Sequence, residues 1–393
     1  MPASRCAESR TLGALGLYVH WPFCRAICPY CDFNVERARD VDQARWRRAL
    51  LAAIDDAAAR TPGRRVDSLF FGGGTPSLMP APTVAAVVDR VADRFGFGDE
   101  PEITLEANPN SAEARAFAGL RAAGVTRLSL GVQALDDAAL KWLGRDHTAA
   151  EARRALATAR ALFPRVGFDL IYARPGQTAA AWRAELGQAV ELAAGHISLY
   201  QLTIEAGTAF GRAQARGRLV IPEADDAAGL YEIAQEVCGA AGLRGYEVSN
   251  HAAPGHESQH NLRYWRYQEY LGIGPGAHGR LVEDGKRWAE EQVRASTAWL
   301  SAVETTGHGR ARREALSAAD QATEMLMMGL RLSEGISLAD FRAVTGGDLN
   351  AFVSAPQLAA LETAALLTRE DGRLRTTIRG RAVLDGVLGA LLV

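Results

Sequence analysis

Three cysteines gathered in one short stretch constrain this chain more than any other feature. Cys24, Cys28 and Cys31 follow the pattern Cys-x3-Cys-x2-Cys, directly after a strand-like run that ends at Pro22. A loop that curls at this place brings three thiols together, and soft thiolates are suited to binding iron. Three thiolates on three corners of an iron–sulfur cube leave the fourth iron open to an outside ligand. We therefore expect a [4Fe-4S] cluster on these cysteines.

Zinc and disulfide bonds are the alternatives to a cluster. A structural zinc could take the three thiolates with His20 as its fourth ligand. Such sites usually combine two Cys-x2-Cys pairs, or one pair with two histidines, and no such set follows in the sequence. Disulfide bonds are not expected, because Cys6 and Cys238 are isolated and we recognise no signal peptide before them.

Length and composition limit the class of protein. The 393 residues suit one large domain and one smaller domain, and a hydrophobic fraction of 48% supports a substantial core. The formal net charge of −2 gives no general attraction to nucleic acids or anionic membranes. No apolar run has the length of a membrane span. We therefore expect a cytoplasmic protein that meets a membrane only through a partner.

Alternating strand-like and helix-like stretches indicate an α/β fold. Helical stretches such as 41–59 and 83–94 separate six strand-like runs, at 15–21, 66–71, 102–108, 127–133, 165–172 and 196–202. This alternation predicts a parallel sheet with helices outside it, and six units suit a partial (β/α)6 TIM-like barrel. In such barrels the chemistry lies at the C-terminal ends of the strands.

Candidate binding residues follow these strand ends. The glycines of the Phe71-Gly-Gly-Gly-Thr-Pro76 string let the backbone approach a ligand closely. An inward-facing Glu106 is costly unless it is paired, and a salt bridge at the rim is the alternative. Arg145 could clamp a carboxylate or lie on the surface. Gln133 offers a donor and an acceptor, and Asp169, which the pattern buries, could accept from ribose hydroxyls.

The cysteine motif, with Tyr30 before its third cysteine, resembles the signature of the radical S-adenosylmethionine (radical SAM) superfamily. The flanking strings LYVHWPFC and DFN are similar to the branch that contains oxygen-independent coproporphyrinogen III oxidases and HemW-type heme chaperones. The resemblance runs along nearly the whole chain. It implies that SAM binds at the open iron and that its contacts are Tyr18, Tyr30, Gly73, Gly74, Thr75, Glu106, Gln133, Arg145 and Asp169.

A histidine-rich loop is expected beyond the barrel, and it contains His251, His256, His260 and His278. A histidine beside aromatic rings could ligate heme iron, although capping and rim packing would explain the same residues. The HNLRYW string resembles the HNxxYW motif of the branch, and this implies heme binding by His260, Asn261, Tyr264 and Trp265. The iron ligand is left open, because four histidines compete for that role.

A change of composition near residue 313 marks a second domain. Helical stretches at 323–332, 337–344 and 355–365, a hairpin over 366–376 and a last helix at 379–391 give a winged-helix outline. Its wing is rich in arginine, which suits DNA binding, but the resemblance implies a docked lid and no nucleic-acid partner. The methionines of 323–332 are expected in the core. The predicted parts are a flexible lead 1–12, a radical SAM barrel 13–235, a connecting segment 236–312 with the HNxxYW loop, and a HemN-type domain 313–393, rich in α-helix.

Two functions are compatible with these features. The first is an oxygen-independent coproporphyrinogen III oxidase, which decarboxylates propionate side chains to give protoporphyrinogen IX. The second is a heme chaperone that uses an electron donor for its cluster and passes heme to an apoprotein of respiratory type. Oxidases of the branch carry a fourth cysteine where this chain has Phe33, a longer N-terminal extension, and a small residue at the place of Gln201. These differences favour the chaperone. A radical SAM enzyme that acts on another tetrapyrrole-like substrate is a third alternative, and whether the chain forms a homodimer is left open.

Overall fold

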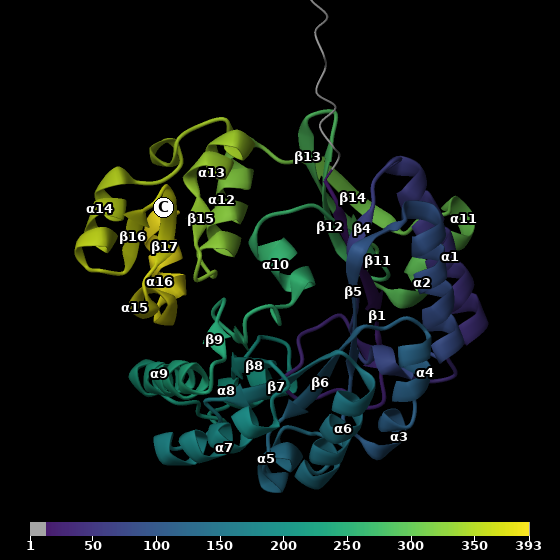
Figure 1. Cartoon of the computed structure of the whole chain (residues 1–393), viewed down its shortest axis with the longest axis horizontal. Coiled ribbons are helices and arrows are strands. Elements are labelled where there is room, and N and C mark those ends of the chain that lie inside the picture. Colours follow the sequence, from purple (N-terminus) through teal and green to yellow (C-terminus); the bar gives the residue numbers. More distant parts are fainter. Residues whose placement is uncertain (1–12, 393) are drawn as a thin grey trace, which may run out of the picture.

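One continuous sheet organises most of the molecule. The computed structural model describes residues 13–392 (Figure 1), so the predicted flexible lead 1–12 lies outside the described residues. The sheet has twelve strands in the order β14-β13-β12-β11-β1-β4-β5-β6-β7-β8-β10-β9. Its parallel strands are β11 (Tyr270–Ile273), β1 (Leu15–Trp21), β4 (Val66–Gly73), β5 (Phe97–Ala107), β6 (Arg127–Gln133), β7 (Arg165–Tyr172) and β8 (His196–Gln201). The six predicted strands are thus confirmed, in their sequence order.

Helices cover the outer face of the parallel strands (Figure 1). In chain order they are α1 (Gln43–Arg60), α2 (Ala81–Phe95), α3 (Ser111–Ala114), α4 (Phe117–Ala122), α5 (Asp137–Trp142), α6 (Ala149–Leu162), α7 (Ala179–Leu192), α8 (Ala209–Ala215) and α9 (Ala224–Ala240). Several begin at a side chain that accepts a backbone N–H; Thr148 and Glu151 form a capping box at the start of α6. The predicted α/β architecture, a parallel sheet with helices outside it, is therefore observed.

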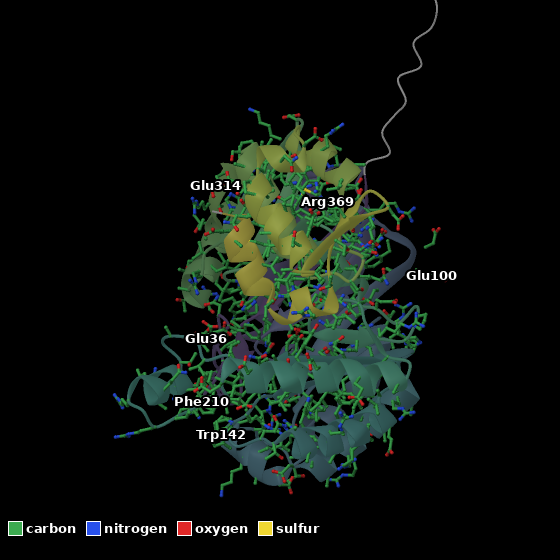
Figure 2. The ribbon with its side chains drawn as sticks, turned by 90° about the vertical axis from the view of Figure 1, so that its left-hand side faces the viewer. Glu36, Glu100, Trp142, Phe210, Glu314 and Arg369 are labelled. Carbon is green, nitrogen blue, oxygen red and sulfur yellow. The ribbon has the colours of Figure 1, made fainter. Side chains whose placement is uncertain are left out.

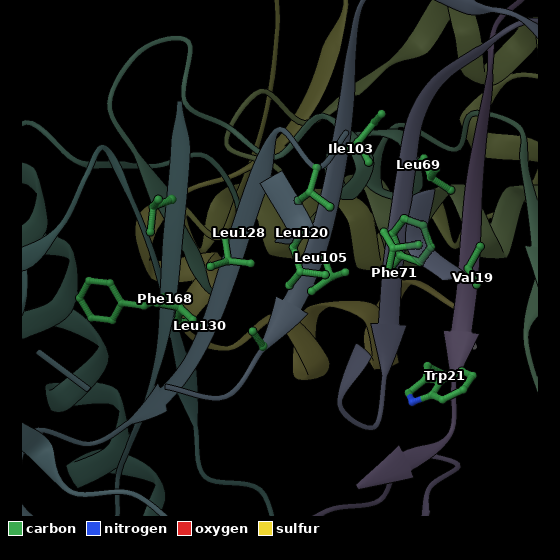
Figure 3. Packing of buried hydrophobic residues seen from close by; sticks show 14 of the residues in the cluster. Val19, Trp21, Leu69, Phe71, Ile103, Leu105, Leu120, Leu128, Leu130 and Phe168 are labelled. Carbon is green, nitrogen blue, oxygen red and sulfur yellow. The ribbon is translucent and has the colours of Figure 1, made fainter. Parts of the chain in front are cut away.

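Alternation along each strand separates the core from the barrel interior. In β1 the odd-numbered residues Leu15, Leu17, Val19 and Trp21 are fully buried under the helices, whereas Tyr18 and His20 face the other side. Figure 3 shows the same apolar layer continuing through Leu69, Leu105 and Leu128 of the next strands. Each fully buried aliphatic side chain contributes about 1.5–3 kcal/mol. Polar residues on the opposite faces are thereby presented to the interior.

The segment after residue 236 extends the same sheet, which the sequence did not predict. Its antiparallel strands are β9 (Arg244–Gly245), β10 (Asn250–Ala252), β12 (His278–Glu283), β13 (Lys286–Gln292) and β14 (Arg310–Ala315), with α11 (Ser296–Thr306) between the last two. The expected histidine-rich loop is wrong for three of its four histidines: His260 lies on helix α10 (Gln259–Trp265), His251 on strand β10 and His278 on strand β12. Ser258 caps this helix by accepting the N–H of Asn261. Helix α10 lies between the C-terminal domain and the sheet (Figure 1).

The C-terminal domain has its own apolar core. It contains helices α12 (Ala318–Gly329), α13 (Leu338–Thr345), α14 (Ala355–Thr363), α15 (Ile378–Ala382) and α16 (Leu384–Leu391), with strands β15 (Ile336–Ser337), β16 (Leu367–Glu370) and β17 (Arg373–Thr376). The single last helix expected at 379–391 is wrong. It breaks at Val383, a β-branched residue between Gly380 and Gly386, which both weaken helices.

Side chains of the wing are engaged within the domain. Arg369 pairs with Glu362, and Arg373 donates to the carbonyl oxygens of Glu334 and Gly335. Figure 2 shows this domain facing the viewer, with Arg369 labelled on it. Among residues 13–392, no helix combines the length and the apolar character that a bilayer crossing requires.

Candidate functional site

The cysteine loop follows β1 and is tied to the glycine-rich turn after β4. Beyond Pro22 the chain forms β2 (Phe23–Cys24), which pairs with β3 (Glu36–Arg37). The N–H of Gly74 donates to the Trp21 carbonyl at 2.7 Å, and the N–H of Thr75 donates to the Phe23 carbonyl at 2.9 Å. Cys24, Cys28 and Cys31 are half-buried free thiols. The loop is therefore fixed at its first cysteine while all three thiols stay accessible.

Glycine is required beside the first thiol. A Cβ atom on Gly74 would lie 2.9 Å from Cys24 Sγ and 2.8 Å from the Phe23 carbonyl oxygen. Gly73 has φ +113°, and a Cβ atom there would lie 2.6 Å from the His20 ring. The backbone thus approaches the cysteine loop as closely as it can. Thr75 Oγ1 lies 3.5 Å from Cys24 Sγ and donates to it.

The arrangement of the thiols can be compared with the needs of zinc and of a cluster. Among residues 13–392, no three His, Cys, Asp or Glu side chains converge closely enough to bind one metal ion. A zinc ion needs every thiolate about 2.3 Å from one point, whereas a cube carries each thiolate on a different iron. His20, the conceivable fourth zinc ligand, has both ring nitrogens hydrogen-bonded, to Tyr18 Oη and to the Asn34 carbonyl. The donor set is compatible with a cluster.

Arg145 places a positive charge beside the thiols. Its Nη1 donates to Cys28 Sγ at 3.3 Å, and its Nη2 donates to the Gly131 carbonyl at 2.9 Å and to Asn108 Oδ1. Its Nε is buried without a partner. The side chain is therefore an inward residue rather than a surface arginine, and among residues 13–392 its Nε–H has no partner.

Gln133 lies at the end of β6 in a strained conformation. Its φ of +70° is uncommon for a residue with a side chain, and such strain is concentrated at functional positions. Its Oε1 is buried without a partner. Buried polar atoms are nearly always paired in proteins. Gln133 Oε1 and Arg145 Nε therefore leave hydrogen-bonding capacity that a bound polar ligand such as SAM would use.

Two acidic side chains face the interior from β5 and β7. Burial raises the pKa of Glu106 from its ordinary 4.5 to about 8, and the nearby charge of Asp169 adds to this shift. Burial also raises the pKa of Asp169, to about 6, although Ser198 and Arg145 favour its ionised form. Glu106 accepts one hydrogen bond, from the Gly73 N–H at 3.2 Å. Within residues 13–392 neither acid forms a rim salt bridge, and a bound cation would relieve the burial cost of Glu106.

Tyr30 lies within the cysteine loop, directly before its third cysteine. Its ring lies 6.3 Å from that of Phe210, and burial raises the pKa of its hydroxyl. Phe210 in turn lies 4.4 Å from Trp142, and Figure 2 shows these two residues at one edge of the molecule. Tyr30 thus anchors the loop on a small apolar cluster.

A cavity of about 690 Å³ lies beside Gly73 and Glu106. The barrel contributes Tyr18, Gly73 and Glu106 to its wall, and the C-terminal domain contributes Glu324 and Met328. Burial raises the pKa of Tyr18 well above its usual range. Of the three methionines of α12, Met325 is buried as expected. The other two are not in the core, because Met327 is 47% exposed and Met328 lines the cavity. The cavity therefore joins the predicted SAM side to the C-terminal domain.

The HNxxYW residues are only partly gathered at this cavity. Tyr264 and Trp265 line it, whereas His260 and Asn261 do not. His260 is 1% exposed; its Nδ1 lies 2.9 Å from Ser68 Oγ, and its Nε2 lies 2.8 Å from Tyr264 Oη. Burial lowers the pKa of His260 to about 3, so the ring is neutral. In this conformation it orients Tyr264 and offers no free nitrogen to iron.

Sequence reasoning missed an ion pair that closes one side of the cavity. Arg280 of β12 pairs with Glu324 of α12 at 2.7 Å, and Tyr267 Oη donates to the same carboxylate at 2.6 Å. Tyr267 has φ +55° and carries the Arg287 guanidinium 4.2 Å from its ring centroid. No local motif marks these residues, because their partners lie 44 and 57 positions away.

Comparisons with known proteins agree with this geometry. The radical SAM superfamily model matches residues 18–186, and the HemN C-terminal domain model matches residues 316–383. The mitochondrial radical S-adenosyl methionine domain-containing protein 1 of Bos taurus is 42% identical over 385 residues, which cover 96% of this chain and 87% of that protein. The heme chaperone HemW of Escherichia coli (strain K12) is 36% identical over 384 residues, covering 97% of this chain and 99% of the relative.

The fold also matches a solved structure. Coproporphyrinogen III oxidase (HemN) from Escherichia coli superposes with a TM-score of 0.81 at 21% sequence identity, covering 96% of this chain and 89% of that chain. At this identity the match establishes the shared fold. The sequence relatives establish the family as well as the fold, because their similarity spans almost the whole chain. The chain belongs to the HemW-type family of radical SAM proteins.

Proposed function

We propose that this chain is a heme chaperone, which binds heme in the cavity beside a SAM-ligated [4Fe-4S] cluster and delivers it to an acceptor apoprotein. The observation that carries the proposal is the cavity itself. Its volume of about 690 Å³ lies within the 300–1,000 Å³ typical of ligand pockets. Aromatic side chains such as Phe33, Tyr264 and Trp265 line it, and flat rings suit the faces of a porphyrin.

Residues of the barrel would bind the cluster and SAM. Cys24, Cys28 and Cys31 would ligate three irons, and the open iron would take the methionine end of SAM. The bound cluster supplies one-electron chemistry toward SAM. The Gly73–Thr75 turn would lie along the methionine end, which we expect to contact Tyr18 and Tyr30 as well.

Charged and polar side chains in the same region would each bind a different part of SAM. Arg145 would donate to a carboxylate through its unused Nε, and Gln133 would present its unpaired Oε1. Glu106 would accept from an ammonium group, which would lower its cost of ionisation. Asp169 would accept from ribose hydroxyls.

Phe33 supports the chaperone over the oxidase. It occupies the position at which oxidases of the branch carry a fourth cysteine, and its side chain is 65% exposed at the cavity. A large apolar ring at this place adds a flat contact surface and no metal ligand. The acceptor we propose is a respiratory-type apoprotein, reached in the cytoplasm, with a separate protein as electron donor to the cluster.

The test compares heme binding with porphyrinogen turnover. The anaerobically reconstituted, reduced protein is incubated with SAM and either heme or coproporphyrinogen III. We expect about one heme per chain, transfer of that heme to an added apocytochrome, and no protoporphyrinogen formation. Catalytic decarboxylation would establish the oxidase instead. Absence of saturable heme binding would contradict the chaperone.

A further inference from the structure

The histidine that faces the cavity is not the one in the HNxxYW motif. The cavity wall includes His20 and His278, whereas His260 lies outside it. Both ring nitrogens of His20 are already bonded, to Tyr18 and to the Asn34 carbonyl. His278 is exposed at the start of β12, and within residues 13–392 its ring makes no hydrogen bond. A lone pair on His278 is therefore available to a ligand in the cavity.

The strand pairing gives His278 a carboxylate neighbour. His278 and Glu291 are directly opposite each other in the β12–β13 ladder, and both line the cavity. Side chains of directly opposite residues lie on the same face, with Cβ atoms about 4.5–5.5 Å apart. A histidine that ligates a metal usually donates its other N–H to a carboxylate, which fixes the ring and strengthens the ligand. Glu291 is in the right register for this role.

Two arginines of the cavity wall differ in whether their guanidinium groups form an ion pair. Arg280 pairs with Glu324, so its guanidinium is already neutralised. Arg294 also lines the cavity, and within the described chain it forms no ion pair, whereas Asn34 fixes its backbone by donating to its carbonyl oxygen at 2.9 Å. A planar guanidinium without a partner recognises carboxylates. Arg294 is thus the cation that a negatively charged ligand would meet.

We infer that His278 ligates the heme iron from β12 and that Arg294 binds a heme propionate. His278 begins β12 and Arg294 follows the end of β13, so both lie at the open end of the β12–β13 hairpin, where one would meet the metal and the other the edge of the porphyrin. This inference rests on the proposed function, since it assigns the contacts of the proposed cargo. It replaces His260 as iron ligand and gives that histidine the role of holding Tyr264.

The test uses the reconstituted protein loaded with ferric heme. Electron paramagnetic resonance reports the axial ligand of ferric heme, and an oxidised [4Fe-4S] cube gives no signal in the same spectrum. We expect His278→Ala to abolish the signature of histidine ligation and to weaken heme binding about tenfold or more. Added imidazole should restore the spectrum, because it can fill the space of the lost ring. His308→Ala, in the loop between α11 and β14 and outside the cavity wall, is the matched control.

The propionate contact has a test of its own. Arg294→Gln should weaken binding of heme about tenfold and leave binding of heme dimethyl ester unchanged, since the ester carries no charge. Arg183→Gln, on helix α7 and outside the cavity wall, is the control. Equal affinities of wild type and Arg294→Gln for heme would overturn the role of Arg294.

The outcomes separate this inference from the proposed function. If wild type binds heme but His278→Ala keeps the same spectrum and affinity, His278 is not the ligand, and the chaperone proposal stands. If wild type binds no heme at all, the chaperone proposal fails and the inference fails with it. Loss of the signature in His278→Ala with recovery by imidazole supports both.

Discussion

Replacing Glu106 by glutamine should stabilise the SAM-free protein while weakening SAM binding. The carboxyl group faces the interior of the barrel and accepts a single hydrogen bond, from Gly73. Burial and the charge of Asp169 raise its pKa from 4.5 to about 8. The folded protein therefore keeps a proton that the unfolded chain has already released near neutral pH. Ionisation inside the barrel is unfavourable until a cation is bound.

The size of the effect follows from the linkage between proton binding and folding. Between pH 4.5 and 8 the folded state binds more protons at this site than the unfolded state, so the free energy of unfolding falls as pH rises. Each unit of pKa corresponds to about 1.4 kcal/mol. From pH 6 to pH 8 the expected loss at this site is about 2 kcal/mol, and access of water through the cavity reduces it toward about 1 kcal/mol.

The assay is urea unfolding of the cluster-free protein at pH 6, 7 and 8, followed by tryptophan fluorescence. Glutamine resembles the protonated acid, so Glu106→Gln should lose this part of the pH dependence and exceed wild type in stability at pH 8. Contributions of groups remote from position 106 are common to both proteins and cancel in the difference. Parallel pH profiles for wild type and variant would refute the reasoning.

A matched control is available at Glu113. This buried carboxylate accepts hydrogen bonds from the Asn108 N–H at 3.0 Å and from Asn110 Nδ2 at 2.9 Å. Glu113→Gln should therefore destabilise the protein, because it removes acceptors from buried donors. Calorimetry of the reconstituted protein completes the test, and Glu106→Gln should weaken SAM binding in it. Unchanged SAM affinity would remove Glu106 from the site.

Three further substitutions test the cluster and its surroundings. Cys24→Ala should abolish the iron–sulfur absorbance after anaerobic reconstitution, and full iron and sulfide content would contradict its role. Gly74→Ala introduces a Cβ atom 2.9 Å from Cys24 Sγ, so it should lower the cluster content while the far-ultraviolet circular dichroism spectrum stays that of wild type. A wild-type content of iron and sulfide would show that the turn can move. Arg145→Ala should weaken SAM binding by about 1–3 kcal/mol, the usual value of a charge-assisted hydrogen bond, as measured by calorimetry. An unaltered isotherm would exclude Arg145 from the SAM site.

The sequence predicted the parallel half of the sheet because local pattern decides it. In β1 and β5 apolar residues alternate with Tyr18, His20 and Glu106. A few consecutive residues therefore predict the strand, its buried face and its inward face. The bounds of β6 and β7 were predicted to the residue. Several candidate residues follow the strand ends, but their assignment to SAM came from the family resemblance and stays a prediction.

The antiparallel half could not be predicted in the same way. Strand β14 reads Arg-Ala-Arg-Arg-Glu-Ala and is mostly exposed, so it lacks the alternation of a half-buried strand. Strand β11 has four residues and is placed by pairing with β1, whose residues precede it by more than two hundred positions. Such strands are set by their neighbours rather than by their own residues.

The same difference explains why the two sides of the site were predicted unequally. His260 looked like a ligand because it is flanked by aromatic residues, yet Ser68, 192 positions away, takes one of its nitrogens. His278 follows an unremarked glycine-rich turn, and its exposure to the cavity depends on β12 being held between β11 and β13. A histidine nitrogen stays free only where no neighbouring residue forms a hydrogen bond with it, and the whole fold decides which residues are its neighbours. The proposed heme contacts must therefore be argued from tertiary structure, even in a chain whose cysteine motif is evident from eight consecutive residues.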